Sequence, residues 1–275
     1  MVKSFQNGIS LDRQNGFTVL LVMIAILGII STIYAGYEYR VSFADKALQL
    51  QTQNQYIHQI GASVDDWYNR NAAIVDGNAL AIAPATIITQ SSLPVQYGLQ
   101  VVSSNRIIAN GIGYHVIVAY LPDDAGVSAL DPATGIFTPA SPKTVFYITN
   151  GMTIETQNLI TTASTLSRLS GVLETWFIGM ENSMPISHRS QNDWFLMPMC
   201  AAADSMHLAC TGGFIDANPV LSAVGLISNG QATDAWGNAI LIDNSTSLAV
   251  APFSIFLKSN TPWGTTSQIS AVGLQ

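Results

Sequence analysis

The feature that most constrains this chain is an uncharged run close to its first residue. No Asp, Glu, Lys or Arg occurs from Gln14 to Tyr37, and close to half of these residues are Leu, Ile, Val or Phe. About 20 such residues form a helix long enough to cross a bilayer. A polar leader, Met1 to Gly16, precedes the run and carries Lys3 and Arg13. Because basic residues stay on the cytoplasmic side, we expect the leader inside and everything after the run outside.

Composition alone leaves three interpretations of this run open. A secretory signal has an apolar core of about 7–15 residues before a small-residue cleavage site, and Ile33-Tyr34-Ala35 is a poor version of such a site. The longer run also fits a plain, uncleaved membrane anchor. The third interpretation is processing at the end of the leader, and the residues around Gly16 favour it.

Gly16-Phe17-Thr18 and the apolar residues after it resemble the processing site of type IV pilins and type II secretion pseudopilins. In that family a dedicated prepilin peptidase cuts after the Gly that ends a polar, basic leader, and the new first residue is usually Phe. The resemblance implies cleavage between Gly16 and Phe17 and methylation of Phe17. It also implies that the mature helix is first a membrane anchor and then packs in a filament core. The residues expected on that helix are Phe17, Leu21, Ile24 and Leu27.

One position departs from the family pattern. The fifth mature residue is usually Glu, which pairs with the N-terminal amine of a neighbouring subunit, and here it is Leu21. A carboxylate inside an apolar bundle is costly unless it is paired, so its loss changes how the subunit can dock. Some minor pseudopilins at the filament tip also lack this Glu, because no subunit lies above them. Leu21 therefore favours a minor or tip subunit over a bulk subunit.

The helical pattern continues beyond the apolar run. Apolar residues recur at steps of three and four through Ile57, Ile60, Val64, Trp67 and Tyr68, with Gln, Asn and Asp between them. We therefore expect one helix over residues 17–75 after a leader of residues 1–16, apolar all round in its first half and amphipathic in its second. The alternative is an anchor followed by a separate core helix.

The head, residues 76–275, is expected to complete an α+β fold with an antiparallel sheet and a second amphipathic helix. Strands are predicted at 106–109, 114–120, 144–149, 239–243 and 248–257, and Pro252 places the last at an edge or a bulge. The second helix ends at Pro185, and its apolar stripe comprises Leu159, Ala163, Leu166, Leu169, Leu173, Trp176 and Met180. Because Thr-Gln-Asn begins a helical stretch at both 52 and 156, the halves 76–150 and 151–275 suggest a duplication; coincidence is the alternative.

The composition bears on location and partners. Charged residues make up only 10% of the 275 residues, and the net charge is −7. Ser, Thr, Asn and Gln carry the polar surface instead, which suits a protein outside the cytoplasm. An acidic exterior argues against a nucleic-acid partner. Gly-x-Ser-x-Gly, phosphate-loop and His-Glu-x-x-His motifs are all missing from the sequence, so we expect no enzyme, and we expect His115 to be a hydrogen-bonded core residue.

Two cysteines, Cys200 and Cys210, are expected to form a disulfide, because nearby cysteines in exported proteins usually pair. Such a bond would stabilise the fold by about 2–3 kcal/mol in the chain-entropy model. The competing interpretation is a metal site that includes His207. The spacing of these residues is not a standard zinc pattern, which favours the disulfide.

A turn is predicted at residues 234–239, where Asp-Ala-Trp-Gly-Asn-Ala is similar to the Asp-Pro-Trp-Gly-Asn stretch of major pseudopilins. Asp and Asn accept backbone donors, and Gly237 allows a positive φ. In pseudopilins a nearby loop holds Ca²⁺, and here Asp234, Asn238 and Asp243 could supply oxygens. We expect a structural turn without a cofactor, with calcium binding as the weaker alternative.

The layout of the long helix, residues 84–98 and the downstream turn also resembles the shufflon-type minor pilins of conjugative type IVb pili, which recognise recipient cells at the pilus tip. The sequence therefore predicts an inner-membrane protein, head in the periplasm, that later joins an extracellular filament. Its expected partners are other pilin subunits, the prepilin peptidase, the inner membrane and a cell-surface ligand. The alternative is a periplasmic binding protein or enzyme held by an uncleaved anchor.

Overall fold

The computed structural model describes residues 10–123, 125–189, 193–195, 213–243 and 252–273, with side chains from residue 20 onward except that of His188. The chain divides into two compact units, Met1–Tyr56 and Ile57–Gln275, and each is described by itself. The expected α+β class is confirmed, with a long apolar N-terminal helix followed by antiparallel sheets and further helices.

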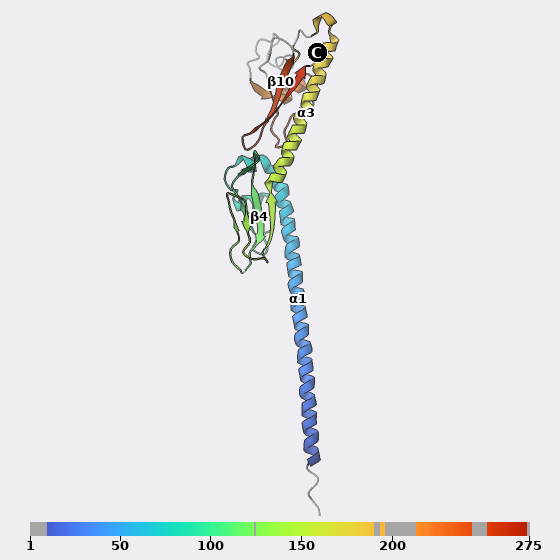
Figure 1. Ribbon diagram of the computed structural model, residues 1–275, viewed down its shortest axis with the longest axis vertical. Helices are drawn as coiled ribbons and strands as arrows, with labels where there is room; N and C mark the ends of the chain where they lie inside the picture. Colours follow the sequence, from blue (N-terminus) through green and yellow to red (C-terminus); the bar gives the residue numbers. More distant parts are fainter. Residues whose placement is uncertain (1–9, 124, 190–192, 196–212, 244–251, 274–275) are drawn as a thin grey trace, which may run out of the picture. The chain divides into compact units, whose positions relative to one another are not determined.

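The first helix, α1, spans Ser10–Gly77 without interruption (Figure 1). No proline occurs within these residues, so every backbone N–H after the first turn can join the helical hydrogen bonds. The prediction of one helix over residues 17–75 is confirmed, and α1 is somewhat longer at both ends. Its last part, from Ile57, supplies buried side chains to the second unit.

The second unit begins with a three-stranded antiparallel sheet in the order β1-β4-β7. These strands are β1 (Gln100–Ser103), β4 (Val116–Leu121) and β7 (Val145–Asn150). All six residues of β4 are buried, as expected for a central strand that is covered on both faces. A short helix, α2 (Pro84–Gln90), joins α1 to this sheet.

Register decides which side of this sheet each residue faces. Tyr147 lies opposite Ala119, and its hydroxyl donates to Asp65 of α1 at 2.7 Å. The opposite face carries Val116, Val118 and Tyr120, which pack against two hairpins. The hairpins are β2 (Ile107–Ala109) with β3 (Ile112–Tyr114), and β5 (Ala129–Leu130) with β6 (Phe137–Thr138).

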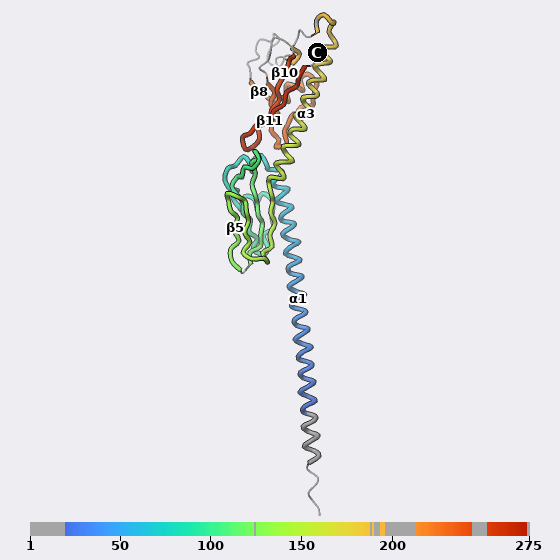
Figure 2. Tube along the Cα trace, in the orientation of Figure 1, coloured from blue at the N-terminus to red at the C-terminus, as the bar shows by residue number. Residues whose placement is uncertain are grey.

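The later part of the unit is built on α3 (Gly151–Ser183), followed by a 3₁₀ turn, η1 (Ile186–His188). A four-stranded antiparallel sheet has the order β11-β10-β9-β8. Its strands are β8 (Phe214–Asp216), β9 (Leu241–Asp243), β10 (Phe253–Asn260) and β11 (Thr266–Gly273), with a short helix, α5 (Ala217–Ala223), after β8. Figure 2 shows α3 beside β10 and β11, and the two strands contact this helix.

One hydrophobic core joins these elements. Leu166, Leu169, Leu173 and Phe177 of α3 pack with alternate residues of β10 and with α5. Phe177 is fully buried, and the backbone of Gly273 passes so close to its ring that a Cβ at that position would clash. The core therefore depends on the packing of the Phe177 ring against a strand position that has no side chain.

The predicted stripe on α3 needs correction at both ends. Leu166, Leu169 and Leu173 are buried as expected. Ala163 is exposed, Leu159, Trp176 and Met180 are only half-buried, and Phe177 is buried instead. Toward the start of α3 the buried face is polar, with Glu155, Asn158 and Thr162. The side chains of these three residues are hydrogen-bonded, and a search for apolar residues alone does not identify them as buried.

The predicted strands agree with β2, β4, β7 and β9, and the range 114–120 also includes the last residue of β3, whereas β1, β5, β6, β8 and β11 were not predicted. The prediction that Pro252 places the last strand at an edge or a bulge is wrong, because β10 pairs with β9 on one side and with β11 on the other. Pro252 lies just outside β10, which begins at Phe253, and proline has no N–H for the sheet. The first half of the head has a short helix, a three-stranded antiparallel sheet and two hairpins, whereas the second has a long helix, a short helix and a four-stranded antiparallel sheet. Duplication of the head stays a hypothesis.

We predict that Leu173→Ala lowers the free energy of unfolding by about 2–5 kcal/mol, because it leaves a cavity in this core. The matched control is Ile160→Ala on the same helix, where the side chain is 59% exposed. The control should change stability by no more than about 0.5 kcal/mol. Chemical unfolding of the full chain in detergent micelles measures both values, and equal effects would contradict the packing described.

Candidate functional site

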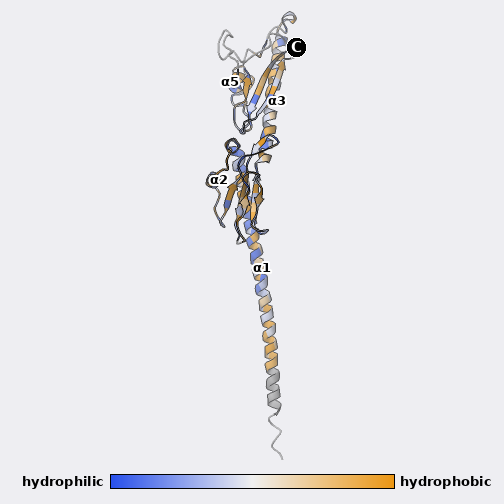
Figure 3. Cartoon of the chain, turned by 60° about the vertical axis from the view of Figure 1, so that its left-hand side comes forward, coloured by the Kyte–Doolittle hydropathy of each residue, from blue (hydrophilic) through white to orange (hydrophobic). Residues whose placement is uncertain are grey.

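The first half of α1 presents apolar side chains on all sides. Every side chain from Leu20 to Gln51 is exposed, and Figure 3 shows much of this part of the helix in the hydrophobic colour. The helix is long and apolar enough to cross a membrane. Soluble monomers seldom expose a contiguous apolar surface of this extent, so it calls for lipid or another apolar surface around it.

Two polar side chains in the middle of the apolar run bond to their own helix. The Ser31 and Thr32 hydroxyls donate to the Gly28 carbonyl at 2.9 Å and 2.8 Å. In a bilayer each polar group has to be satisfied within the protein, because no water is available there. The hydroxyl groups of Ser31 and Thr32 are therefore compatible with a lipid environment.

The sequence-predicted residues of this helix all lie on α1. Gly16 and Phe17 are within its backbone, and their side chains are outside the described set. Leu21, Ile24 and Leu27 are 51%, 57% and 65% exposed. Because each is three positions from the next along the helix, the three side chains occupy neighbouring positions on the helix surface.

The predicted Cys200–Cys210 disulfide and its alternative metal site with His207 lie outside the described residues. The Asp234–Asn238 turn is described, and its expected structural role is confirmed. Asp234 Oδ1 accepts the N–H groups of Trp236 at 3.0 Å and Asn238 at 2.8 Å. Gly237, with φ +82°, donates its N–H to the Asp234 carbonyl.

The other carboxylate oxygen of Asp234 is also engaged. It accepts the Ser259 hydroxyl at 2.7 Å and the Asn238 amide at 3.5 Å. These bonds join the turn to the end of β10 and use the oxygens that a cation would need. Within the described residues there is no cluster of three or more His, Cys, Asp or Glu suited to a metal. Calcium binding by Asp234, Asn238 and Asp243 stays a prediction.

A second polar cluster is buried deeper in the unit. Tyr68, Asp76 and His115 are each 0% exposed. The Tyr68 hydroxyl donates to Asp76 Oδ1 at 2.6 Å and accepts the backbone N–H of His115 at 2.8 Å. His115 Nδ1 lies 3.1 Å from the same Asp76 oxygen, and its Nε2 lies 3.3 Å from the Leu80 carbonyl. The expectation of a hydrogen-bonded core histidine is confirmed.

Glu155, in the first turns of α3, brings a second carboxyl group to this cluster. Its carboxyl group is 0% exposed and neighbours that of Asp76, whose Oδ2 atom is buried without an N–H or O–H donor among the described residues, so a proton on the pair can bridge the two groups. Trp236 Nε1 donates to Glu155 Oε2 at 2.6 Å, which connects the cluster to the Asp234–Asn238 turn. We refer to Tyr68, Asp76, His115, Glu155 and Trp236 as the carboxyl-pair cluster.

Burial dominates the titration of the pair. Loss of solvation, followed by the neighbouring Asp76, raises the pKa of Glu155 to about 9. Burial also raises the pKa of Asp76 to about 6, although hydrogen bonds from Glu155, Tyr68 and the His115 N–H oppose that rise. At neutral pH the two carboxyl groups therefore share one proton.

The groups around the pair are consistent with this single charge. Burial lowers the pKa of His115, so its ring is neutral at pH 7 and donates only one hydrogen bond. The Arg106 guanidinium donates to the Asp76 carbonyl at 3.0 Å and supplies the nearby positive charge. The Gly151 N–H donates to the His115 carbonyl, and a Cβ on Gly151 would collide with the Tyr68 hydroxyl.

Sequence reasoning missed this cluster, although a signal was present. Glu155, Asn158 and Thr162 precede Leu166, Leu169 and Leu173 at steps of three and four, so they extend the apolar stripe of α3 toward its start. An acidic residue in register with an apolar stripe indicates a buried carboxyl group. Its partner Asp76 carried no such signal, because Asp-Gly-Asn at 76–78 has the composition of a turn.

No family model, curated protein or solved structure matched the chain in the three comparisons made with known proteins.

We predict that Asp234→Ala lowers the free energy of unfolding by about 2–4 kcal/mol, since four hydrogen-bond donors lose their acceptor. Asp131→Ala, in an exposed turn, should cost no more than about 1 kcal/mol. Chemical unfolding of the full chain in micelles compares the two.

A calcium titration tests the alternative role of the turn. If the turn is purely structural, the melting temperature of the unchanged protein is the same with added Ca²⁺ as with a chelator. A higher melting temperature with Ca²⁺ would favour the cation site.

We also predict that stability falls as pH rises. Both carboxyl groups have a higher pKa in the folded than in the unfolded chain, so stability from the shared protons is complete below about pH 4 and declines through about pH 6 and about pH 9. Glu155→Gln keeps an N–H toward Asp76 and a carbonyl for Trp236 but cannot ionise. It should flatten the decline and raise stability at about pH 8 by at least about 1 kcal/mol.

Asp66→Asn is the control, because Asp66 is an exposed carboxylate on α1 that pairs only with Arg70. Its slope of melting temperature against pH should equal that of the unchanged protein. A Glu155→Gln variant that keeps the full slope, or that loses stability at alkaline pH, would refute the shared proton. The measurement is thermal unfolding of the full chain in micelles across this pH range.

Proposed function

We propose that this chain is a minor subunit of a type IV pilus or a related filament, inserted in the inner membrane and assembled through the first half of α1. The observation that carries the proposal is an exposed apolar helix that follows a polar, basic leader ending in Gly16, with Phe17 directly after it. A leader of this kind resembles that of the pilin family, and the helix surface is of the kind that needs lipid or neighbouring helices.

The assembly step follows from the same surface. In the membrane, lipid covers Leu21, Ile24, Leu27 and the other apolar side chains. On transfer to a filament, neighbouring helices replace the lipid, so the helix stays out of water throughout and little hydrophobic free energy is lost. The folded head, with its own core, remains in the aqueous space and is available for contact with another cell.

The minor role rests on Leu21. An apolar residue at the fifth mature position cannot neutralise the amine of a neighbouring subunit, so a position without such a neighbour is favoured. A tip position meets that condition and leaves the head open to solvent for adhesion or recipient-cell contact. The conjugative, shufflon-type group fits this layout best within the family.

A second candidate is a periplasmic binding protein or enzyme held by an uncleaved signal anchor. The length of the apolar run and the preceding Lys3 and Arg13 favour an anchor equally well. The two candidates differ in the first residue of the mature chain. The pilin proposal requires Phe17, whereas the anchor proposal requires an intact leader.

We predict that co-expression with a prepilin peptidase removes residues 1–16 and leaves a methylated Phe17 as the first residue. Gly16→Leu should block this cleavage, because the site requires a small residue before the cut. Gly8→Leu, in the same leader but away from the junction, should be processed normally. Intact-mass measurement and N-terminal sequencing read the outcome.

An unprocessed wild-type chain in the presence of active peptidase would favour the anchored alternative. A start near Gly36 would instead indicate a secretory signal. Labelling of the head along the whole length of sheared filaments would leave the filament role intact and contradict the minor one.

A further inference from the structure

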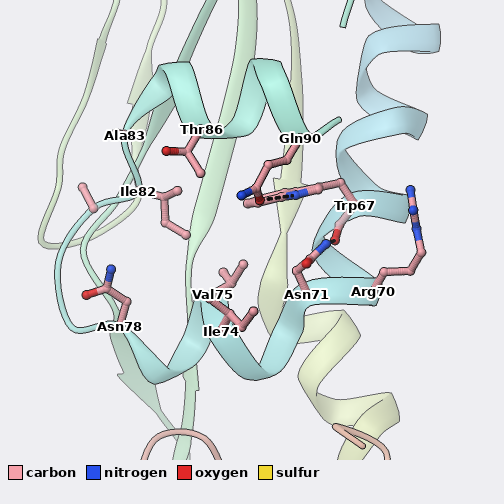
Figure 4. A pocket seen from close by; sticks show the side chains of 11 residues that line it. Trp67, Arg70, Asn71, Ile74, Val75, Asn78, Ile82, Ala83, Thr86 and Gln90 are labelled. Carbon is pink, nitrogen blue, oxygen red and sulfur yellow. Dashed lines mark hydrogen bonds between the residues drawn. The ribbon is translucent and has the colours of Figure 1, made fainter. Parts of the chain in front are cut away.

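A groove in the head lies between the last turns of α1 and the helix α2. It has a volume of about 630 Å³, within the range of about 300–1,000 Å³ that small-molecule sites occupy. Figure 4 shows its walls: Trp67 and Asn71 from α1 on one side, and Thr86 and Gln90 from α2 on the other. The groove is separate from the carboxyl-pair cluster and from the apolar first half of α1.

Three amide side chains in the groove are held at one end by the protein. Gln90 Oε1 accepts Trp67 Nε1 at 3.1 Å. Asn71 Nδ2 donates to the Trp67 carbonyl at 2.8 Å, and Asn78 Oδ1 accepts the Leu80 N–H at 3.4 Å. These bonds fix the orientation of each amide before any ligand arrives, which lowers the entropy cost of binding.

The other end of each amide is left for a ligand. Within the described residues, Gln90 Nε2 and Asn78 Nδ2 remain as donors, Asn71 Oδ1 as an acceptor, and the Thr86 hydroxyl as both. The arrangement therefore offers donors and acceptors side by side. A hydroxyl group, which donates and accepts at once, matches such a mixture.

The charge and the apolar surface of the lining limit the chemical class of ligand further. Arg70 is the one charged residue in the lining, and it pairs with Asp66 at 2.6 Å. Figure 4 shows its side chain extending away from Thr86 and Ile82. Ile74, Val75 and Ile82 add apolar surface between the polar groups. A ligand with hydroxyl groups, C–H faces and no charge complements this lining.

We propose that the groove binds a neutral oligosaccharide. Its hydroxyl groups would pair with the free ends of Asn71, Asn78 and Gln90 and with Thr86, and the C–H face of a sugar ring would lie on Ile74 or Ile82. An extended peptide is less suitable, because peptides usually pair with a strand edge and this groove is walled by two helices. The inference extends the proposed cell contact by naming the chemistry of the ligand, yet it does not depend on processing at Gly16.

The test uses the full chain with its leader, in a zwitterionic detergent without a sugar headgroup that could compete. The probes are maltotriose, cellotriose, chitotriose and lacto-N-tetraose, with 3′-sialyllactose as the acidic probe and tri-alanine as the peptide probe. Titration calorimetry should detect binding of at least one neutral probe. Thr86→Val, which removes one hydroxyl group, should weaken that binding about 2- to 12-fold. Ala83→Trp should abolish it by filling the groove.

Two matched controls lie on the same helix outside the lining. Thr89→Val and Ala85→Trp make the same chemical changes at exposed positions of α2 and should leave binding unchanged. Failure of all neutral probes to bind overturns the proposal, as does tighter binding of 3′-sialyllactose or tri-alanine. Equal binding by Thr86→Val, Ala83→Trp and their controls also overturns it. None of these outcomes affects the filament proposal, which the mature N-terminus decides.

Discussion

The shared proton between Asp76 and Glu155 is the constraint on which the head most depends. The two carboxyl groups are fully buried, and two negative charges in that position would repel each other without solvent to screen them. One retained proton turns this repulsion into a hydrogen bond. The remaining charge is then held by the hydroxyl of Tyr68, with the guanidinium of Arg106 nearby.

This arrangement connects parts of the chain that are distant in sequence. Asp76 belongs to the end of α1, His115 to the junction of β3 and β4, Glu155 to the start of α3, and Trp236 to the turn before β9. Each contributes a hydrogen bond that needs the others in place, so the elements must be correctly positioned together. Gly151 is also required by this arrangement, because α3 begins directly against the Tyr68 hydroxyl and leaves no room for a Cβ.

The sequence predicted the fold class and many elements because these depend on local patterns. Apolar periodicity located α1 and the middle of α3, and turn residues located the Asp234–Asn238 turn. The buried polar face of α3 was missed because Glu155 and Thr162 become favourable inside only through Trp236 and Ala235, which lie far away in sequence. The groove was missed for a related reason, since an amide such as Asn71 or Gln90 looks like ordinary surface until its neighbours are known.

The two ends of α1 illustrate how one helix meets two different requirements. Around Leu27 the side chains are apolar on every side, and the polar hydroxyls bond back to the Gly28 carbonyl, so no surroundings need to supply hydrogen bonds. Around Tyr68 and Asp76 the helix instead places polar groups inward, where only specific partners can satisfy them. The first requirement tolerates exchange of lipid for other apolar helices, because apolar contact is non-directional. The second does not tolerate exchange, because a hydrogen bond such as that from Tyr68 to Asp76 needs its partner at a defined distance and direction.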